Sequence, residues 1–216
     1  MDGLSLSSPL TEIYDRQSGI ESFSDSSAMV IGIGGIGSWL ALDLALIGVG
    51  TLILIDPDKL EPSNLNRTLF KLNQVETFKT LAVKDLITER RPDTIVLTIE
   101  ESFYPQLLEK YKVDFIFDAT DNLATRSLIQ EHFTKVPNTP YCKVGYDGFQ
   151  ATISINDYQS GRWGDEGNYT AVPSFFGTPQ ILSAVAIIEM LLVKKDHSGS
   201  TNFNVKKLLK KIKEKI

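Results

Sequence analysis

AMVIGIGGIG, residues 28–37, joins a run of apolar residues to a cluster of glycines. The apolar part predicts a buried strand over 28–33, because aliphatic and β-branched residues follow one another there without a polar break. The apolar residues that come after the glycines predict a helix over 38–47. A strand, a glycine turn and a helix in this order are typical of the first unit of a parallel α/β sheet.

The glycines of this turn match the phosphate-binding pattern G-x-G-x-x-G through Gly32, Gly34 and Gly37, with Gly35 beside them. Such glycines let backbone N–H groups approach a phosphate, whose negative charge is favoured at the N-terminus of the helix. Asp56 closes the next predicted strand about 20 residues further on, where a carboxylate can bind a ribose hydroxyl. The turn therefore predicts an adenine-nucleotide site, and by itself it suits NAD as well as ATP.

The rest of the chain alternates predicted strands with predicted helices, which indicates a Rossmann-like α/β domain with a mixed, mostly parallel sheet flanked by helices. Further strands are expected over 51–55, 94–99, 113–117, 141–145 and 150–155, and further helices over 79–90, 107–111, 123–133 and 180–193. Polar and apolar residues alternate over 150–155, as in an antiparallel or solvated edge strand. We expect an N-terminal arm over 1–27, an ATP-binding domain over 28–198 and a basic amphipathic tail over 199–216.

The composition argues against several classes of protein. The 216 residues are 42% hydrophobic and 23% charged, as in a globular domain, and the net charge of −5 makes nucleic acid an unfavourable partner. No apolar run reaches the roughly 18 residues that span a bilayer, and the first residues do not resemble a secretory signal, so a cytoplasmic location is expected. With one cysteine, Cys142, and two histidines, no zinc site is expected.

Residues that suit a triphosphate follow Asp56 in the sequence. Arg67 can bind phosphate oxygens in a bidentate manner, Lys79 can add a compact positive charge, and Asp121 can bind magnesium. Each of them alone could instead be a surface charge or a helix cap. A dinucleotide dehydrogenase has no need of all three, so as a set they favour ATP with Mg²⁺ over NAD.

In their order along the chain, these segments resemble the ThiF/MoeB/HesA family, whose fold is shared by the ubiquitin-activating enzymes. The matching segments are 14–17, the glycine turn, 48–50, 56–58, 63–67, 78–79, 118–122 with Arg126, and 145–150. The resemblance implies ATP- and Mg²⁺-dependent adenylation of the C-terminal carboxylate of a small ubiquitin-like or sulfur-carrier protein. The products would be an acyl-adenylate and pyrophosphate.

The resemblance also implies roles for individual residues. Asp56 would hold the ribose and Asp121 the magnesium ion, while Arg67 and Lys79 would stabilise the charge that develops during adenylyl transfer. Arg16 would act with them by reaching across a homodimer interface into the partner's ATP site. The residues implied to bind the nucleotide are Gly32, Gly34, Gly35, Gly37, Asp56, Asp58, Asn64, Arg67, Lys79, Asp121 and Asn122.

The sequence departs from the pattern of the family at several places. The two C-x-x-C zinc pairs of MoeB-like members are absent, and Thr68 stands where glutamine is common. The long loop expected over 157–178 lacks the cysteine with which many members form a thioester, and Cys142 lies in a predicted buried strand. The reaction is therefore expected to stop at the adenylate, or a thiol-bearing partner takes part. Within that loop, residues 162–169 are either a carrier-binding loop or a solvated insertion.

Other functions stay open at the level of the sequence. The chain could adenylate a different substrate, as a tRNA threonylcarbamoyladenosine dehydratase or a peptide-adenylating enzyme does, or it could be a non-catalytic nucleotide-binding scaffold. An NAD(P)-dependent oxidoreductase is the least favoured, because it would leave Arg67, Lys79 and Asp121 without a role. The six lysines of 205–216 predict an amphipathic helix that packs on the body or docks to an acidic carrier or an anionic membrane.

Overall fold

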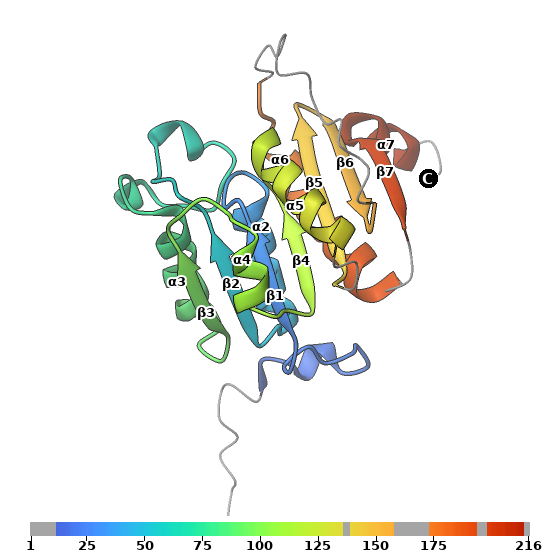
Figure 1. Ribbon diagram of the computed structural model, residues 1–216. Helices are drawn as coiled ribbons and strands as arrows, with labels where there is room; N and C mark the ends of the chain where they lie inside the picture. The colour runs from blue at the N-terminus through green and yellow to red at the C-terminus, as the bar shows by residue number, and fades with distance from the viewer. Residues whose placement is uncertain (1–11, 136–138, 158–172, 194–197, 214–216) are drawn as a thin grey trace, which may run out of the picture.

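The computed structural model describes residues 12–135, 139–157, 173–193 and 198–213, and these form one sheet of seven strands (Figure 1). The strands lie in the order β3-β2-β1-β4-β5-β6-β7. The parallel strands are β1 (Ser27–Ile31), β2 (Thr51–Ile55), β3 (Ile95–Ile99), β4 (Phe115–Asp118) and β5 (Tyr141–Asp147). Antiparallel to their neighbours are β6 (Gln150–Ile155) and β7 (Gly199–Asn204). The expected Rossmann-like fold with a mixed, mostly parallel sheet is confirmed.

Helices cover both faces of the sheet. One face carries α2 (Gly37–Ile47), α3 (Lys79–Arg90) and α6 (Gly177–Ile187), and the other carries α4 (Gln106–Lys110) and α5 (Leu123–Lys135). The remaining helical segments are η1 (Asp15–Gln17), η2 (Pro62–Asn64), η3 (Leu72–Gln74), the π-helical η4 (Ile188–Val193) and α7 (Val205–Lys213). This three-layer arrangement buries the central strands on both sides.

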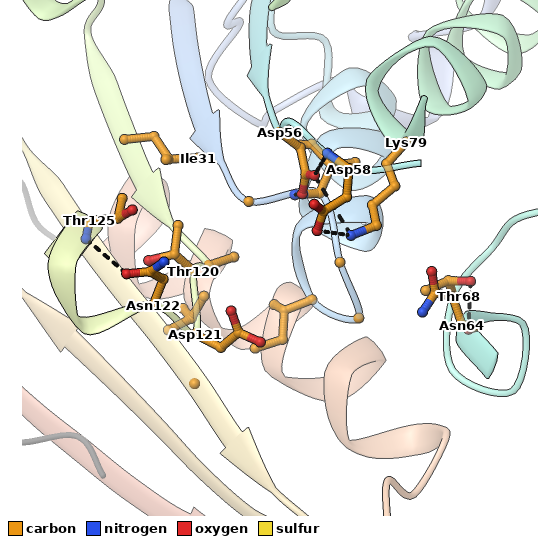
Figure 2. Close-up of a pocket in the computed structure, with 18 of the residues that line it drawn as sticks. Ile31, Asp56, Asp58, Asn64, Thr68, Lys79, Thr120, Asp121, Asn122 and Thr125 are labelled. Carbon is orange, nitrogen blue, oxygen red and sulfur yellow. Dashed lines mark hydrogen bonds and ion pairs between the residues drawn. The ribbon is translucent and has the colours of Figure 1, made fainter. Parts of the chain in front are cut away.

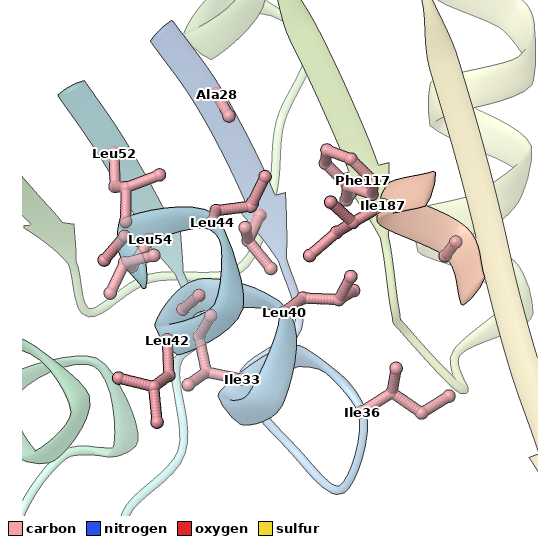
Figure 3. Close-up of a cluster of buried hydrophobic side chains, with 14 of the residues drawn as sticks. Ala28, Ile33, Ile36, Leu40, Leu42, Leu44, Leu52, Leu54, Phe117 and Ile187 are labelled. Atoms are coloured by element: carbon pink, nitrogen blue, oxygen red, sulfur yellow. The ribbon is translucent and has the colours of Figure 1, made fainter. Parts of the chain in front are cut away.

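The core explains why the central strands and α2 are so apolar in sequence. Along β1, Val30 faces the α2 side and Met29 the α5 side, and both are fully buried. Strands buried on both faces are expected to be continuously hydrophobic. Leu40 and Leu44 of α2 pack in the same cluster as strand and α6 residues (Figure 3). Because α2 lies between α3, α6 and the sheet, it is apolar on most of its surface.

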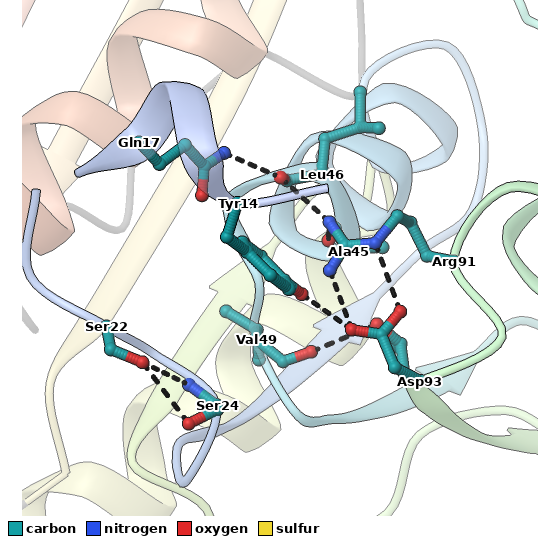
Figure 4. Close-up of polar contacts among 10 residues, drawn as sticks. Tyr14, Gln17, Ser22, Ser24, Ala45, Leu46, Val49, Arg91 and Asp93 are labelled. Carbon is teal, nitrogen blue, oxygen red and sulfur yellow. Dashed lines mark hydrogen bonds and ion pairs between the residues drawn. The ribbon is translucent and has the colours of Figure 1, made fainter. Parts of the chain in front are cut away.

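A polar cluster at the amino ends of the strands ties the N-terminal arm to the domain (Figure 4). Arg91, only 2% exposed, donates to the carbonyl oxygens of Ala45 (2.6 Å) and Leu46 (2.9 Å) at the end of α2. Its Nε and Nη2 atoms bind the two carboxylate oxygens of Asp93 at 3.1 and 2.8 Å. The ring of Tyr14 lies 4.3 Å from the guanidinium, and its hydroxyl donates to Asp93. These contacts satisfy the buried guanidinium among the residues that the structure describes.

The C-terminal segment differs from the sequence expectation. Residues 199–204, expected at the start of the tail, form β7, which pairs with β6 along its whole length. The strand 150–155 is therefore antiparallel, as expected, but it is not an edge. The predicted helix over 180–193 begins at Gly177 and turns π-helical after Ile187. None of the helices in the described part of the chain is long and apolar enough to cross a membrane.

Candidate active site

A cavity of about 430 Å³ lies at the carboxyl ends of the parallel strands (Figure 2). Its walls include residues 31–36, from the last residue of β1 onward, and 55–58, from the last residue of β2 onward. Residues 119–122 after β4 and 144–148 at the end of β5 complete this part of the lining. The order of the strands reverses here, because both β2 and β4 are neighbours of β1. Open α/β sheets bind their ligands at such a switch point.

The glycine turn leaves room for a ligand at one position in particular. Gly32 has a φ of +86°, and a Cβ on Gly37 would lie 1.7 Å from the Gly32 carbonyl oxygen. The backbone itself therefore requires these two glycines. At Gly34 a Cβ would meet no atom within 4 Å. Since packing does not account for Gly34, a ligand that approaches the backbone closely is the better explanation.

Asp56 holds the glycine turn against the end of β2. It is 5% exposed, and its carboxylate accepts hydrogen bonds from the backbone N–H groups of Ile33 (2.6 Å) and Asp58 (2.8 Å). Burial raises the pKa of Asp56 above its ordinary value, and the nearby Lys79 opposes that rise. Asp56, which is predicted to bind the ribose, thus lines the cavity and also fixes the conformation of the glycine turn. Each carboxylate oxygen keeps a second lone pair for a ligand.

Lys79 brings a positive charge to the same wall. Its Nζ lies 2.8 Å from an Asp58 oxygen and 3.7 Å from Asp56 Oδ1. The Lys79 side chain is 13% exposed, whereas that of Asp58 is 64% exposed. Figure 2 shows the three side chains together beside the glycine turn. The ammonium group is therefore positioned at the cavity before any ligand binds.

Arg67 lies in the loop that follows β2, where hydrogen bonds within the chain fix its backbone. The indole N–H of Trp39 donates to the Arg67 carbonyl oxygen (3.1 Å), and the side chain of Asn64 binds the backbone at the start of η2. Arg67 Nη1 donates to Ser63 O (2.7 Å) and Asn66 Oδ1 (2.9 Å). Its Nε and Nη2 make no hydrogen bond with any residue that the structure describes. The half-buried guanidinium thus lines the cavity with donors to spare.

The last residue of β4 and the residues that follow it divide into structural and cavity-facing groups. Asp118 is fully buried and accepts hydrogen bonds from Thr120 and from the Tyr141 hydroxyl (2.8 Å). Asn122 lines the cavity, but its side-chain oxygen caps the first turn of α5 at 2.8 and 3.2 Å. Asp121 is exposed, lines the cavity and makes no hydrogen bond or ion pair with a described residue. Its carboxylate is therefore available to a ligand in the cavity.

Residues 9–179 of the chain match the ThiF family. The chain belongs to this family. The sulfur carrier protein ThiS adenylyltransferase of Escherichia coli (strain K12) is 32% identical over 140 residues, which cover 63% of this chain and 55% of that protein. The tRNA threonylcarbamoyladenosine dehydratase of Bacillus subtilis (strain 168) is 33% identical over 117 residues, 52% of this chain and 46% of that protein. The chain thus spans about half the length of these two relatives.

Solved structures share the fold of this ThiF-family chain. E. coli MccB, crystallised with AMPCPP and MccA, superposes with a TM-score of 0.72 at 19% identity. The match covers 93% of this chain and 72% of MccB. At this identity the likeness establishes the architecture alone.

The described residues of the ThiF-family chain include no group of three or more His, Cys, Asp or Glu side chains that could hold a metal ion. Magnesium at a nucleotide site needs no such group, since one or two carboxylates, the phosphates and water complete its coordination. Asp121 fits that pattern. Cys142 is fully buried, and burial raises the pKa of its thiol far above the ordinary value. A buried, protonated thiol is a poor nucleophile.

Arg16 does not line the cavity of its own chain. It is exposed on η1, whose Gln17 donates to Leu46 O at the C-terminal end of α2 (3.0 Å). The glycine turn lies at the other end of this 11-residue helix, about 16 Å away at 1.5 Å per residue. Arg16 therefore lies at the amino end of the sheet and the cavity at the carboxyl end. Its action on the site of a second molecule stays a prediction.

The sequence predicted no site residue in the wall of the cavity on the β5 side, although the segment 145–150 matches the family. Tyr146 and Ser174 line it, and their hydroxyl groups lie 3.3 Å apart. The Tyr146 hydroxyl would come within 2.8 Å of a Cβ on Gly35, so the ring lies against the glycine turn. Arg126, named above only for its family resemblance, lines the cavity and donates to Thr120 O. The candidate carrier-binding loop, 162–169, lies outside the described residues.

Proposed function

We propose that the protein binds ATP with Mg²⁺ and adenylates the C-terminal carboxylate of a small ubiquitin-like or sulfur-carrier protein. One observation carries the proposal: the cavity that holds the glycine turn is also lined by Arg67, Lys79 and Asp121. Two cations and an unengaged carboxylate suit a triphosphate with its metal ion. An NAD(P)-dependent oxidoreductase would leave Arg67, Lys79 and Asp121 without a role in its chemistry.

The chemistry follows from the charges in the cavity. A carboxylate oxygen of the substrate attacks the α-phosphorus of ATP, and pyrophosphate leaves. No general base is needed, because a carboxylate is already ionised at neutral pH. Lys79 and Arg67 stabilise the negative charge that grows on the phosphate oxygens, and the glycine turn orients the phosphates. Magnesium held at Asp121 would neutralise part of the phosphate charge.

The thiol chemistry of some family members would need a second protein. Cys142 is the only cysteine of the sequence, and it is buried in β5. The proposed product is therefore the acyl-adenylate, which either leaves or is passed to a thiol-bearing partner. A homodimer is part of the same proposal, because the position of Arg16 allows it to serve only the cavity of another molecule.

Adenylation of a tRNA-linked group is the second candidate, supported by the similarity to the B. subtilis dehydratase. The net charge of −5 opposes it, since contacts to phosphates dominate the affinity of proteins for nucleic acid. Binding of bulk tRNA at moderate salt, measured by filter retention, would reverse this order of preference.

Calorimetry with MgATP, NAD and NADP tests the nucleotide directly. We expect MgATP to bind and NAD and NADP not to bind. Both Arg67→Ala and Asp121→Ala should weaken the binding of MgATP. The matched control is Lys112→Ala, because Lys112 is exposed at the amino end of the sheet. This variant should bind MgATP as tightly as the wild type does. Binding of NAD in place of ATP would contradict the proposal. Pyrophosphate exchange in the presence of carboxylate substrates then tests the adenylation step.

A further inference from the structure

Three phenylalanines form a cluster at the surface, here called the aromatic patch: the exposed Phe149 and Phe176 and the half-buried Phe175. The ring centroids of Phe149 and Phe175 are 4.8 Å apart, and those of Phe175 and Phe176 are 4.9 Å apart. Phe149 is 40% exposed and Phe176 56% exposed. Isolated exposed aromatic residues are common, but a contiguous group of them marks an interaction site.

Hydrogen bonds hold the patch in a fixed arrangement. The buried hydroxyl of Thr178, in the first turn of α6, donates to Gly148 O at 2.7 Å. The backbone N–H of Val205, the first residue of α7, donates to Phe149 O at 2.9 Å. The β5–β6 turn and the starts of α6 and α7 therefore meet at Phe149. A surface built at such a junction is preorganised for binding, which lowers the entropic cost of association.

The aromatic patch begins at the rim of the cavity. Gly148 and Ser174 line the cavity, and each is followed directly in the chain by a residue of the patch. Successive Cα atoms are about 3.8 Å apart, so the patch and the cavity wall are contiguous. The strand β5 is three places from β2 in the sheet, about 14 Å at the usual strand spacing. The patch thus adjoins the side of the cavity away from Asp56 and Lys79.

Positive charge borders the aromatic patch. Lys206 Nζ lies 5.9 Å from the ring centroid of Phe149, and Lys207 is exposed next to it on α7. The whole chain, in contrast, has a net charge of −5. A ligand that covers the patch therefore meets apolar rings and ammonium groups side by side, which complements an apolar residue among acidic ones.

We propose that the aromatic patch, with Lys206 and Lys207, binds the C-terminal segment of the substrate polypeptide. The chemistry of the surface selects an acidic segment with an apolar side chain among the last few residues before the carboxylate. This inference rests on the proposed function, because the carboxylate must enter the cavity for the patch to lie along its path. It adds a determinant of specificity outside the nucleotide site.

Fluorescein-labelled decapeptides with a free carboxyl terminus provide the test. Four peptides vary two properties independently: acidic or neutral charge, and leucine or serine at the third residue from the end. Their affinities are measured by fluorescence anisotropy with AMPCPP in excess. We expect the acidic leucine peptide to bind about tenfold more tightly than its serine counterpart, as burial of one aliphatic side chain implies.

Matched variants connect the preference to the surface. Phe149→Ser and Phe176→Ser should abolish the preference for leucine, and Lys206→Glu should abolish the preference for acidic peptides. Leu72→Ser removes an apolar side chain that is 75% exposed outside the patch, and Lys112→Glu reverses a charge at the amino end of the sheet. Both controls should keep the two preferences. Circular dichroism confirms that each variant is folded.

The outcomes separate the patch from the proposed function. If MgATP fails to bind in calorimetry, the proposed function fails, whatever the peptides show. If MgATP binds but the four peptides bind equally, or if the patch variants keep the preference for leucine, the inference about the patch is overturned. If the wild-type protein self-associates and Phe176→Ser abolishes this association, the inference is also overturned, because the patch would then bind a second copy of the chain.

Discussion

The two ends of the sheet each hold a buried or half-buried arginine, and the two arginines are in opposite situations. At the amino end, Arg91 is 2% exposed, binds two carbonyl oxygens and both oxygens of Asp93, and lies against the ring of Tyr14. At the carboxyl end, Arg67 is half-buried, with only Nη1 engaged by its own loop. The hydrogen-bonding capacity of Arg91 is thus used within the chain, whereas Arg67 retains unused donors at a cavity.

This difference separates stability from function in physical terms. A buried charge is tolerated when hydrogen bonds and an opposite charge compensate its desolvation, as they do for Arg91. Charges that line a cavity with unused hydrogen-bonding capacity contribute little to the fold, and the compensation comes from a ligand. Substitutions at the amino end should therefore change stability, and substitutions at the carboxyl end should change binding and turnover.

The largest effect is expected for Arg91→Ala. Loss of the guanidinium leaves Asp93 and the last carbonyl groups of α2 without their partner, and we expect the free energy of unfolding to fall by about 3–5 kcal/mol. Urea denaturation measures this change. The neighbouring Arg90→Ala, at an exposed position, should change it by less than about 0.5 kcal/mol. An Arg91→Ala protein that keeps its stability but loses ATP binding would reverse the comparison.

Lys79→Ala, in contrast, should change turnover rather than stability. We expect the rate of adenylate formation to fall about 100- to 1000-fold, as for the loss of a group that stabilises transition-state charge. Pyrophosphate exchange measures this rate. Lys84→Ala, on the same helix α3, serves as the control and should keep the wild-type rate. A large fall in the unfolding free energy of Lys79→Ala would show that its ion pairs with Asp56 and Asp58 are structural.

The glycine turn allows the same contrast within four residues. Gly34→Ala should leave the melting temperature unchanged or slightly higher, because its Cβ meets nothing within the chain. The same substitution should lower the affinity for ATP about tenfold, which is roughly the effect of losing one hydrogen bond to a charged group. Gly37→Ala should instead impair folding, since its Cβ would clash with the Gly32 carbonyl oxygen. Calorimetry and thermal denaturation together distinguish the two variants. An equal loss of stability in both would contradict the explanation that Gly34 is there to let a ligand approach the backbone.

The smallest effect concerns Asp43, the charged residue of the largely apolar α2. Burial raises its pKa above the ordinary value of 3.8, although Ser183 donates to it at 2.6 Å. Because the folded state then binds the proton more tightly than the unfolded state does, the wild type loses stability relative to Asp43→Asn as the pH rises above 3.8 through the folded pKa. Unfolding free energies of both proteins at a series of pH values test this. A difference that stays constant across that range would contradict it.

The sequence predicted the parts of the fold whose pattern is strong. The strands 51–55 and 150–155 and the helix 79–90 have the predicted bounds, because their apolar periodicity is not interrupted. In contrast, β7 reads GSTNFN and has no apolar run. It is a strand because β6 offers an unpaired edge, and such a tertiary cause leaves no local signal.

The candidate site shows the same division. Lys79, Arg67 and Asp121 were predicted from their order after the glycine turn, and all three line one cavity. Asn122 directly precedes the predicted helix 123–133, where asparagine is a preferred N-cap, and its side-chain oxygen caps α5 rather than facing a ligand. The pairing of Tyr146 with Ser174 joins the matching segment 145–150 to a residue 28 positions further on that belongs to no motif. Such contacts arise from the fold alone.

The position of η1 has a consequence for kinetics. Because Arg16 and the cavity lie at opposite ends of one sheet, a catalytic contribution from Arg16 requires two molecules, and the turnover per molecule should decline on dilution. Inactive chains should then complement one another. A mixture of Arg16→Ala and Lys79→Ala proteins should regain activity, since one mixed site combines an intact arginine with an intact lysine. Without such complementation, Arg16 has no part in the reaction.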